Sequence, residues 1–68
     1  MKLTINGQEE NIGQKELTVT ELLKIKEVKM PEMVSVELNE EILDREKFET
    51  TKIKEGDKIE FLYFMGGG

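Results

Sequence analysis

The chain has 68 residues, the length of one small domain. It contains no Cys and no His, so disulfide bridges and the common zinc sites are excluded and hydrophobic packing has to hold the fold. The net charge of −5 argues against binding to nucleic acid, which needs clustered Lys and Arg, and allows a partner with a basic docking face.

The first segment, MKLTI, alternates apolar and polar residues, which predicts a strand over residues 1–5 with one buried face. The pair Asn6-Gly7 favours a two-residue hairpin turn, because such turns need positive φ angles. The chain should then return through residues 8–12 as a second, more polar strand. We interpret Asn6-Gly7 as a turn and not as a functional site.

A helix is predicted next, from Val19 to Lys26. Thr18 is a good N-cap, and Glu21 follows three residues later, as in a capping box. The apolar stripe at helical spacing, which we interpret as core packing, consists of Val19, Leu22 and Leu23. Pro31 marks the loop that follows the helix.

The second half of the chain contains two further strands with alternating patterns. VSVEL predicts a strand over residues 34–38, and a final strand should run from residue 58 to about 65. The predicted pieces between them are a turn at residues 39–40, a short strand at 41–43, one helical turn at 44–48 in which Phe48 covers the core, and a turn at 55–57.

These elements predict an α+β domain over residues 1–65, with a mixed sheet of four or five strands. One main helix should cover one face of the sheet and leave the other face open to water or to a partner. Residues 66–68 should form a flexible C-terminal tail, because no glycine there has a side chain whose burial could offset the ordering entropy.

The residue inventory argues against an enzyme. His, the usual general base, is absent, and so is the strongest nucleophile, Cys. The acidic pairs Glu9-Glu10 and Glu40-Glu41 are neighbours in the sequence, and neighbours in a strand point to opposite faces. We interpret them as solvated charge.

The final strand carries an unusual outer face. Ile59, Phe61 and Tyr63 share one face of this strand, and Glu60, Leu62 and Phe64 share the other. The charge of Glu60 indicates that the second face is the outer one. Two apolar side chains on a polar face indicate either a contact surface or a strand end that a loop covers.

The chain ends in Gly66-Gly67-Gly68. Such an end is the thinnest peptide available, so it can enter a narrow channel and present its carboxylate to an active site. A carboxylate is a poor electrophile that must first be activated, for example as an acyl-adenylate. The tail is typical of a substrate handle for another enzyme, the alternative being an end without function.

The hairpin, the helix, the later strands and the glycine terminus together resemble the ubiquitin-like β-grasp proteins. Within them the chain resembles the ThiS type of the ThiS/MoaD family of sulfur carriers. The matching stretch is VSVELNEEILDREKFETTKIKEGDKIEFLYFMGGG, and the N-terminal half, with its NG hairpin and TVTELL helix, also fits. The resemblance covers nearly the whole chain.

The resemblance implies adenylation of Gly68 by a ThiF-like enzyme that uses ATP and Mg. A sulfur donor such as a cysteine desulfurase would then supply sulfur, and the resulting thiocarboxylate would deliver it to thiazole synthase (ThiG-like) for thiamin. Gly66 and Gly67 would give access to the channel. The residues implied to contact the adenylating enzyme are Leu62, Phe64 and Met65.

Two alternatives remain open at this point: a MoaD-like carrier for molybdopterin synthesis, and a ubiquitin-like interaction module that is never activated. In each case we expect no bound cofactor or metal. The sequence has no membrane-spanning stretch and does not begin as a signal peptide, and the absence of Cys fits a cytoplasmic protein, which we expect to be a monomer.

Overall fold

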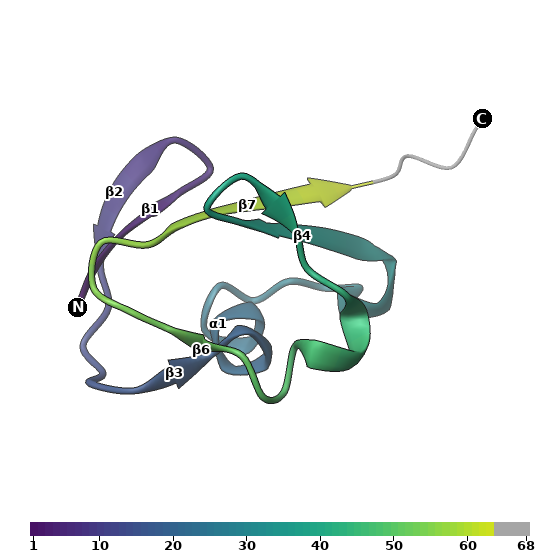
Figure 1. The fold of residues 1–68 in the computed structure, drawn as a ribbon, viewed down its shortest axis with the longest axis horizontal. Coiled ribbons are helices and arrows are strands. Elements are labelled where there is room, and N and C mark those ends of the chain that lie inside the picture. Colours follow the sequence, from purple (N-terminus) through teal and green to yellow (C-terminus); the bar gives the residue numbers. More distant parts are fainter. Residues whose placement is uncertain (64–68) are drawn as a thin grey trace.

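The computed structural model describes residues 1–63 and contains two sheets and one α-helix (Figure 1). In chain order the elements are β1 (Lys2–Ile5), β2 (Gln8–Asn11), β3 (Leu17–Thr18), α1 (Val19–Ile25), the 3-10 helix η1 (Pro31–Met33), β4 (Val34–Leu38), β5 (Glu41–Ile42), the 3-10 helix η2 (Arg45–Lys47), β6 (Lys52–Ile53) and β7 (Lys58–Tyr63).

The main sheet has five strands in the order β2-β1-β7-β4-β5. Strands β1 and β7 are parallel, and the other neighbours are antiparallel, so the sheet is mixed. A second sheet contains only β3 and β6. Helix α1 lies on one side of the main sheet (Figure 1). The predicted α+β class, with five strands and one helix across one face, is confirmed.

Both hairpins close with residues in the left-handed region. Asn6 and Gly7 have φ angles of 51° and 83°, as the predicted turn requires. Asn39 and Glu40 do the same between β4 and β5, with φ angles of 51° and 71°. Asn tolerates this conformation readily, whereas Glu adopts it at a cost.

Helix α1 has defined signals at both ends. The Thr18 hydroxyl accepts a hydrogen bond from the Glu21 N–H at 3.2 Å, and the Glu21 carboxylate accepts one from the Thr18 N–H at 2.8 Å. At the other end Glu27 has a φ of 55°, and the Val28 N–H donates to the Leu23 carbonyl at 3.0 Å, which forms a Schellman ending. The helix therefore matches the predicted range, with Lys26 as its C-cap.

The core lies between the helix and the inner face of the main sheet. Its buried members are Leu3, Ile5, Ile12, Leu17, Val19, Leu22, Leu23, Val34, Val36, Phe48, Ile53, Ile59 and Phe61. Phe48 follows η2 and is 6% exposed, which confirms its predicted place at the end of the core. No buried side chain within residues 1–63 is polar or charged.

The structure adds elements that the sequence pattern does not predict. Strands β3 and β6 pair through Leu17 opposite Ile53, and residues 31–33 form a 3-10 helix where a loop was expected. The final strand is described as far as Tyr63, so the predicted continuation to residue 65 and the tail 66–68 lie outside the described residues. No helix in residues 1–63 is long and apolar enough to cross a membrane.

Candidate functional site at the C-terminal strand

The strand that leads to the C-terminus is the central strand of the main sheet. On one side β7 pairs with β4 over five positions, from Leu38 opposite Ile59 to Val34 opposite Tyr63. On the other side it pairs in parallel with β1, through Thr4 opposite Lys58 and Ile5 opposite Ile59. Strand β7 is therefore paired on both sides at Lys58 and Ile59, and with β4 alone at Leu62 and Tyr63.

The inner face of β7 belongs to the core only for part of its length. Ile59 is fully buried and Phe61 is 8% exposed, as the alternation predicts. Tyr63 points to the same side of the sheet but is 55% exposed. The three side chains therefore share one face as predicted, but only the first two are buried, because the core ends before the strand does.

The outer face of β7 carries Lys58, which is exposed, and Glu60 and Leu62, which are both half-buried. Leu62 lies opposite Ser35 on β4, and Glu60 lies opposite Glu37. Beyond Glu37, Ile42 on the edge strand β5 extends this face and is 63% exposed. The sequence pattern did not predict Ile42 as part of this face, because one apolar residue in a two-residue strand shows no alternation.

Glu37 and Glu60 place two like charges directly opposite each other on the outer face. Such pairs are unfavourable, and among residues 1–63 the ion pairs are Lys26–Glu10 and Lys52–Glu16, so neither carboxylate is neutralised there. The surface next to the C-terminal strand is thus acidic with apolar neighbours, Leu62 and Ile42. This combination suits a basic partner surface with apolar contacts.

One edge of β7 becomes open toward its end. The Phe61 N–H donates to the Asn6 side-chain oxygen at 2.8 Å, and the Asn6 N–H donates to the Ile59 carbonyl at 2.9 Å. Backbone groups of alternate residues in a strand point to the same side, so the Tyr63 N–H and C=O also face the β1 side. Because β1 has already turned at Asn6, within the described chain no strand lies beside Tyr63 there.

Arg45 supports the segment that faces the end of β7. Its guanidinium donates to the Pro31 carbonyl and to the Val34 carbonyl, both at 2.7 Å, and lies 5.4 Å from the centre of the Phe48 ring. Val34 is the residue opposite Tyr63. The arginine thus ties η2 to the start of β4, and through it to the last described residues of β7.

Of the predicted site residues, Leu62 lies on the outer face as expected. Phe64, Met65 and the carrier position Gly68, with Gly66 and Gly67, lie outside the described residues. In residues 1–63 no group of three or more acidic side chains is placed to hold a metal ion. The described part of the site is therefore a fixed strand, an open edge and an acidic-apolar face.

Comparisons with known proteins agree with this architecture. Residues 3–68 match the model of the ThiS family. A crystal structure of the thiamine biosynthesis protein ThiS from Geobacter metallireducens is similar, with a TM-score of 0.91 and 54% identity over the whole of both chains. A solution structure of a thiamine biosynthesis protein from the same organism has a TM-score of 0.85 and 54% identity, covering 100% of this chain and 88% of that one.

A curated relative is longer. A thiazole synthase of Paramagnetospirillum magneticum is 40% identical over all 68 residues, but this chain spans only 20% of that protein's length. The match of the family model over almost the whole chain, together with a fold shared at 54% identity, shows the family. This chain belongs to the ThiS family.

Proposed function

We propose that this chain is a sulfur carrier for thiamin biosynthesis and not an enzyme, with Gly68 as the residue that carries sulfur. The observation that carries the proposal is the match to the ThiS family, which extends through the glycine terminus to residue 68. The similar structure with a TM-score of 0.91 is that of a thiamine biosynthesis protein.

The chemistry begins at the Gly68 carboxylate, which is ionised near neutral pH. Attack of a carboxylate oxygen on the α-phosphorus of ATP forms an acyl-adenylate and releases pyrophosphate. A persulfide sulfur on the donor attacks the acyl carbon and expels AMP, and a thiol then reduces the acyl disulfide to the thiocarboxylate with formation of a disulfide. The ThiF-like enzyme would bind ATP and Mg, and the carrier itself would need no cofactor.

The described residues support separate roles for the folded domain, which would bind the partner, and for the tail, which would enter its active site. The central position of β7 gives the tail a fixed base, so the position of its end depends on the few residues after Tyr63. Leu62, with Phe64 and Met65, would contact the activating enzyme, and Gly66 and Gly67 would pass through its channel. The open edge at Tyr63 offers this partner a backbone donor and acceptor for strand pairing.

The receiving enzyme would be a ThiG-like thiazole synthase. Support comes from the Paramagnetospirillum protein, which bears that name and contains a segment 40% identical to this chain. No corresponding observation favours molybdopterin synthesis. The sulfur donor would be a cysteine desulfurase or a similar persulfide source, and the carrier would act as a cytoplasmic monomer.

The test is sulfur loading followed by intact-mass measurement. The chain, MgATP, a ThiF-like enzyme and a sulfide donor should give a product in which one oxygen is replaced by sulfur. Deletion of Gly68 should abolish loading, since it withdraws the carboxylate by up to about 3.5 Å, and about 1 Å can cost about a hundredfold in rate. Gly67→Val should damage loading by widening the tail and restricting its backbone.

The unfolding midpoint in urea provides the control. Neither tail change should move it, because the proposal assigns the tail no part in the core. Loading of the truncated chain at the rate of the unchanged protein would remove Gly68 as the carrier residue.

A further inference from the structure

A groove is lined by the N-terminal residue and by residues in or next to β3 and β6. In Figure 1 these elements lie away from the last described residues of β7. The groove has a volume of about 450 Å³ and lies beside the small β3–β6 sheet. Its lining residues are Met1, Gln14, Lys15, Glu16, Lys52, Ile53, Lys54 and Glu55. None of these residues belongs to the acidic-apolar face of the main sheet, so the groove is a separate surface.

One wall of the groove, formed by residues 54–57, is held in place by hydrogen bonds. The Lys2 N–H donates to the Glu55 carboxylate at 3.0 Å, and the Gly56 N–H donates to the Lys2 carbonyl at 2.8 Å. The Lys54 N–H donates to the Asp57 carboxylate at 2.8 Å. The backbone of this wall is therefore ordered before a ligand binds, which lowers the entropic cost of binding.

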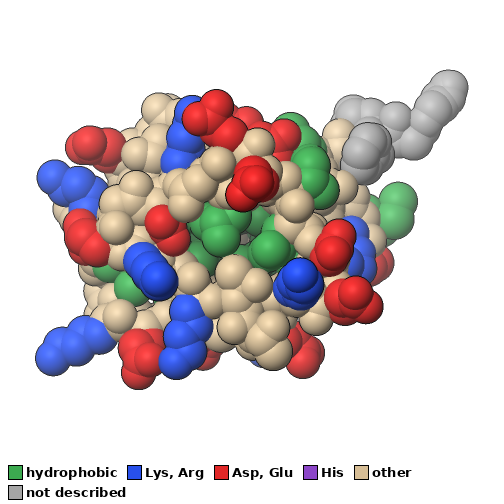
Figure 2. All heavy atoms as spheres, viewed as in Figure 1, with side chains coloured by type: hydrophobic (Ala, Val, Ile, Leu, Met, Phe, Trp, Pro, Cys, Tyr) green, Lys and Arg blue, Asp and Glu red, His purple; other side chains and the backbone are tan. Residues whose placement is uncertain are grey.

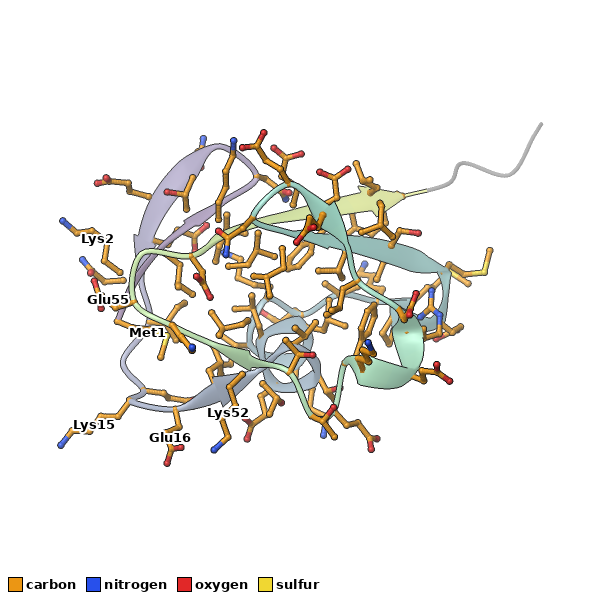
Figure 3. All side chains as sticks on the ribbon, viewed as in Figure 1. Met1, Lys2, Lys15, Glu16, Lys52 and Glu55 are labelled. Carbon is orange, nitrogen blue, oxygen red and sulfur yellow. The ribbon has the colours of Figure 1, made fainter. Side chains whose placement is uncertain are left out.

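The lining is basic although the protein as a whole is acidic. Three lysines stand against two glutamates, which leaves one positive charge in excess: Glu16 pairs with the Lys52 ammonium at 3.0 Å, and Glu55 accepts a hydrogen bond from the Lys2 N–H. Lys15 and Lys54 form no ion pair with any residue in the range 1–63. Figure 3 shows Lys15 pointing outward, with Glu16 and Lys52 next to each other.

The Lys52–Glu16 pair can also be exchanged. Its side chains are 64% and 77% exposed, and exposed ion pairs of this kind contribute little to stability. An incoming carboxylate can therefore take Lys52 as a partner at small cost. Figure 2 shows basic and acidic side chains interspersed at this end of the molecule, with small areas of apolar surface between them.

We infer that this groove is a docking site for an extended acidic segment of a partner protein. Its lysines can form ion pairs with carboxylates of the segment, and Met1 contributes a half-buried apolar side chain to its lining. A nucleic acid fits less well, because phosphate binding needs a larger cluster of Lys and Arg than three lysines set among two glutamates. The inference is independent of the sulfur-carrier proposal, since it needs no activation of Gly68.

The test is a titration of the ¹⁵N-labelled protein followed by amide chemical shifts. The probe is a short synthetic peptide of Glu residues with a central Leu, and the same peptide with Gln in place of Glu is its control. The acidic peptide should shift amides near residues 14–16 and 52–55, whereas the Gln peptide should not. Equal shifts with both peptides, or none with either, would overturn the proposal.

Charge-reversal variants locate the site. Lys15→Glu/Lys54→Glu should weaken peptide binding about tenfold or more, because it replaces two attractions with repulsions. Lys29→Glu/Lys47→Glu makes the same charge change at exposed positions outside the groove and should leave the affinity within about twofold. Equal weakening by the two variants would show a general charge effect and would also overturn the proposal.

Two further measurements complete the design. Lys15→Gln/Lys54→Gln removes the positive charges without adding negative ones and should give an intermediate loss, which separates lost attraction from new repulsion. A single-stranded oligonucleotide should bind more weakly than the acidic peptide. Tighter binding of the oligonucleotide at the same amides would assign the groove to nucleic acid instead.

Discussion

The two faces of the main sheet are made by the same strands but have opposite characters. On the inner face Val34, Val36 and Ile59 are fully buried, and Phe61 is 8% exposed. On the outer face the neighbouring residues of the same two strands are half-buried and mostly polar, and Ile42 beside them is 63% exposed. Because neighbouring residues of a strand point to opposite faces, inward side chains of these strands stabilise the fold and outward ones are free to contact a partner. Substitutions one residue apart should therefore affect different properties.

The largest effect on stability should come from Ile59→Ala. Ile59 is fully buried in the central strand, and removal of such a side chain costs about 2–5 kcal/mol. In a domain whose total stability is roughly 5 kcal/mol, this would leave much of the protein unfolded. Urea unfolding followed by circular dichroism would measure the change.

Ile42→Ala is the matched control on the outer face, because it makes the same chemical change at a side chain that is 63% exposed. Its free energy of unfolding should change by no more than about 0.5 kcal/mol. Comparable losses for the two variants would contradict the separation of the faces.

Arg45→Ala should have the next largest effect on stability. The guanidinium donates to the Pro31 carbonyl in η1 and to the Val34 carbonyl at the start of β4, and bonds from charged groups contribute about 1.5–3 kcal/mol when they are shielded. Because Arg45 is exposed, we expect about 1.5 kcal/mol, the low end of that range.

Lys47→Ala, in the same 3-10 helix, should cost far less, and Arg45→Lys should recover only part of the loss because an ammonium lacks the planar fork. Urea midpoints compare the three variants. Full recovery with Arg45→Lys would show that charge alone matters at this position.

Leu62→Glu should affect binding more than folding. Leu62 lies on the outer face next to the predicted tail, and a charge there should weaken binding to a ThiF-like enzyme about tenfold, equivalent to about 1.4 kcal/mol. Isothermal titration would give the affinity, and circular dichroism would confirm the fold.

Asn11→Glu adds the same charge at the far edge of the outer face, on β2, and should leave the affinity nearly unchanged. If Leu62→Glu bound as tightly as the unchanged protein, the outer face would have no part in recognition.

The smallest effect should come from Glu60→Lys, which replaces a like-charge pair with an opposite-charge pair across β4 and β7. The free energy of unfolding should rise by about 0.2–1 kcal/mol, and the gain should shrink as salt is added. Glu9→Lys, which lies opposite Thr4, controls for the change in net charge. An equal gain in that variant would trace the effect to net charge and not to the facing pair.

The sequence predicted those parts of the fold that depend on local pattern. The capping box at Thr18, the positive-φ pair Asn6-Gly7 and the alternation of β4 each have a signal within a few residues, and each is confirmed. The β3–β6 pair was missed because a two-residue strand has no measurable periodicity and its partner is far away in the sequence.

The site could be predicted in part for the same physical reason. The alternation placed Leu62 on the outer face correctly, but it could not show that the core ends before Tyr63, since that depends on packing between elements. The open edge at Tyr63 and the two carbonyls held by Arg45 depend on where β1 stops and where η1 begins. The glycine terminus was recognised from the sequence, and its loading with sulfur stays a prediction.

The central position of β7 has a mechanical consequence. A force that draws Tyr63 along the strand axis would load the hydrogen bonds to β1 and β4 together, because the antiparallel bonds to β4 are perpendicular to the strand and the parallel bonds to β1 are slanted across it. Bonds loaded in shear share the force, whereas the bonds of an edge strand that is peeled away break one after another. A partner that pulls on this end of the molecule would therefore move the domain as one body before it could unravel the strand.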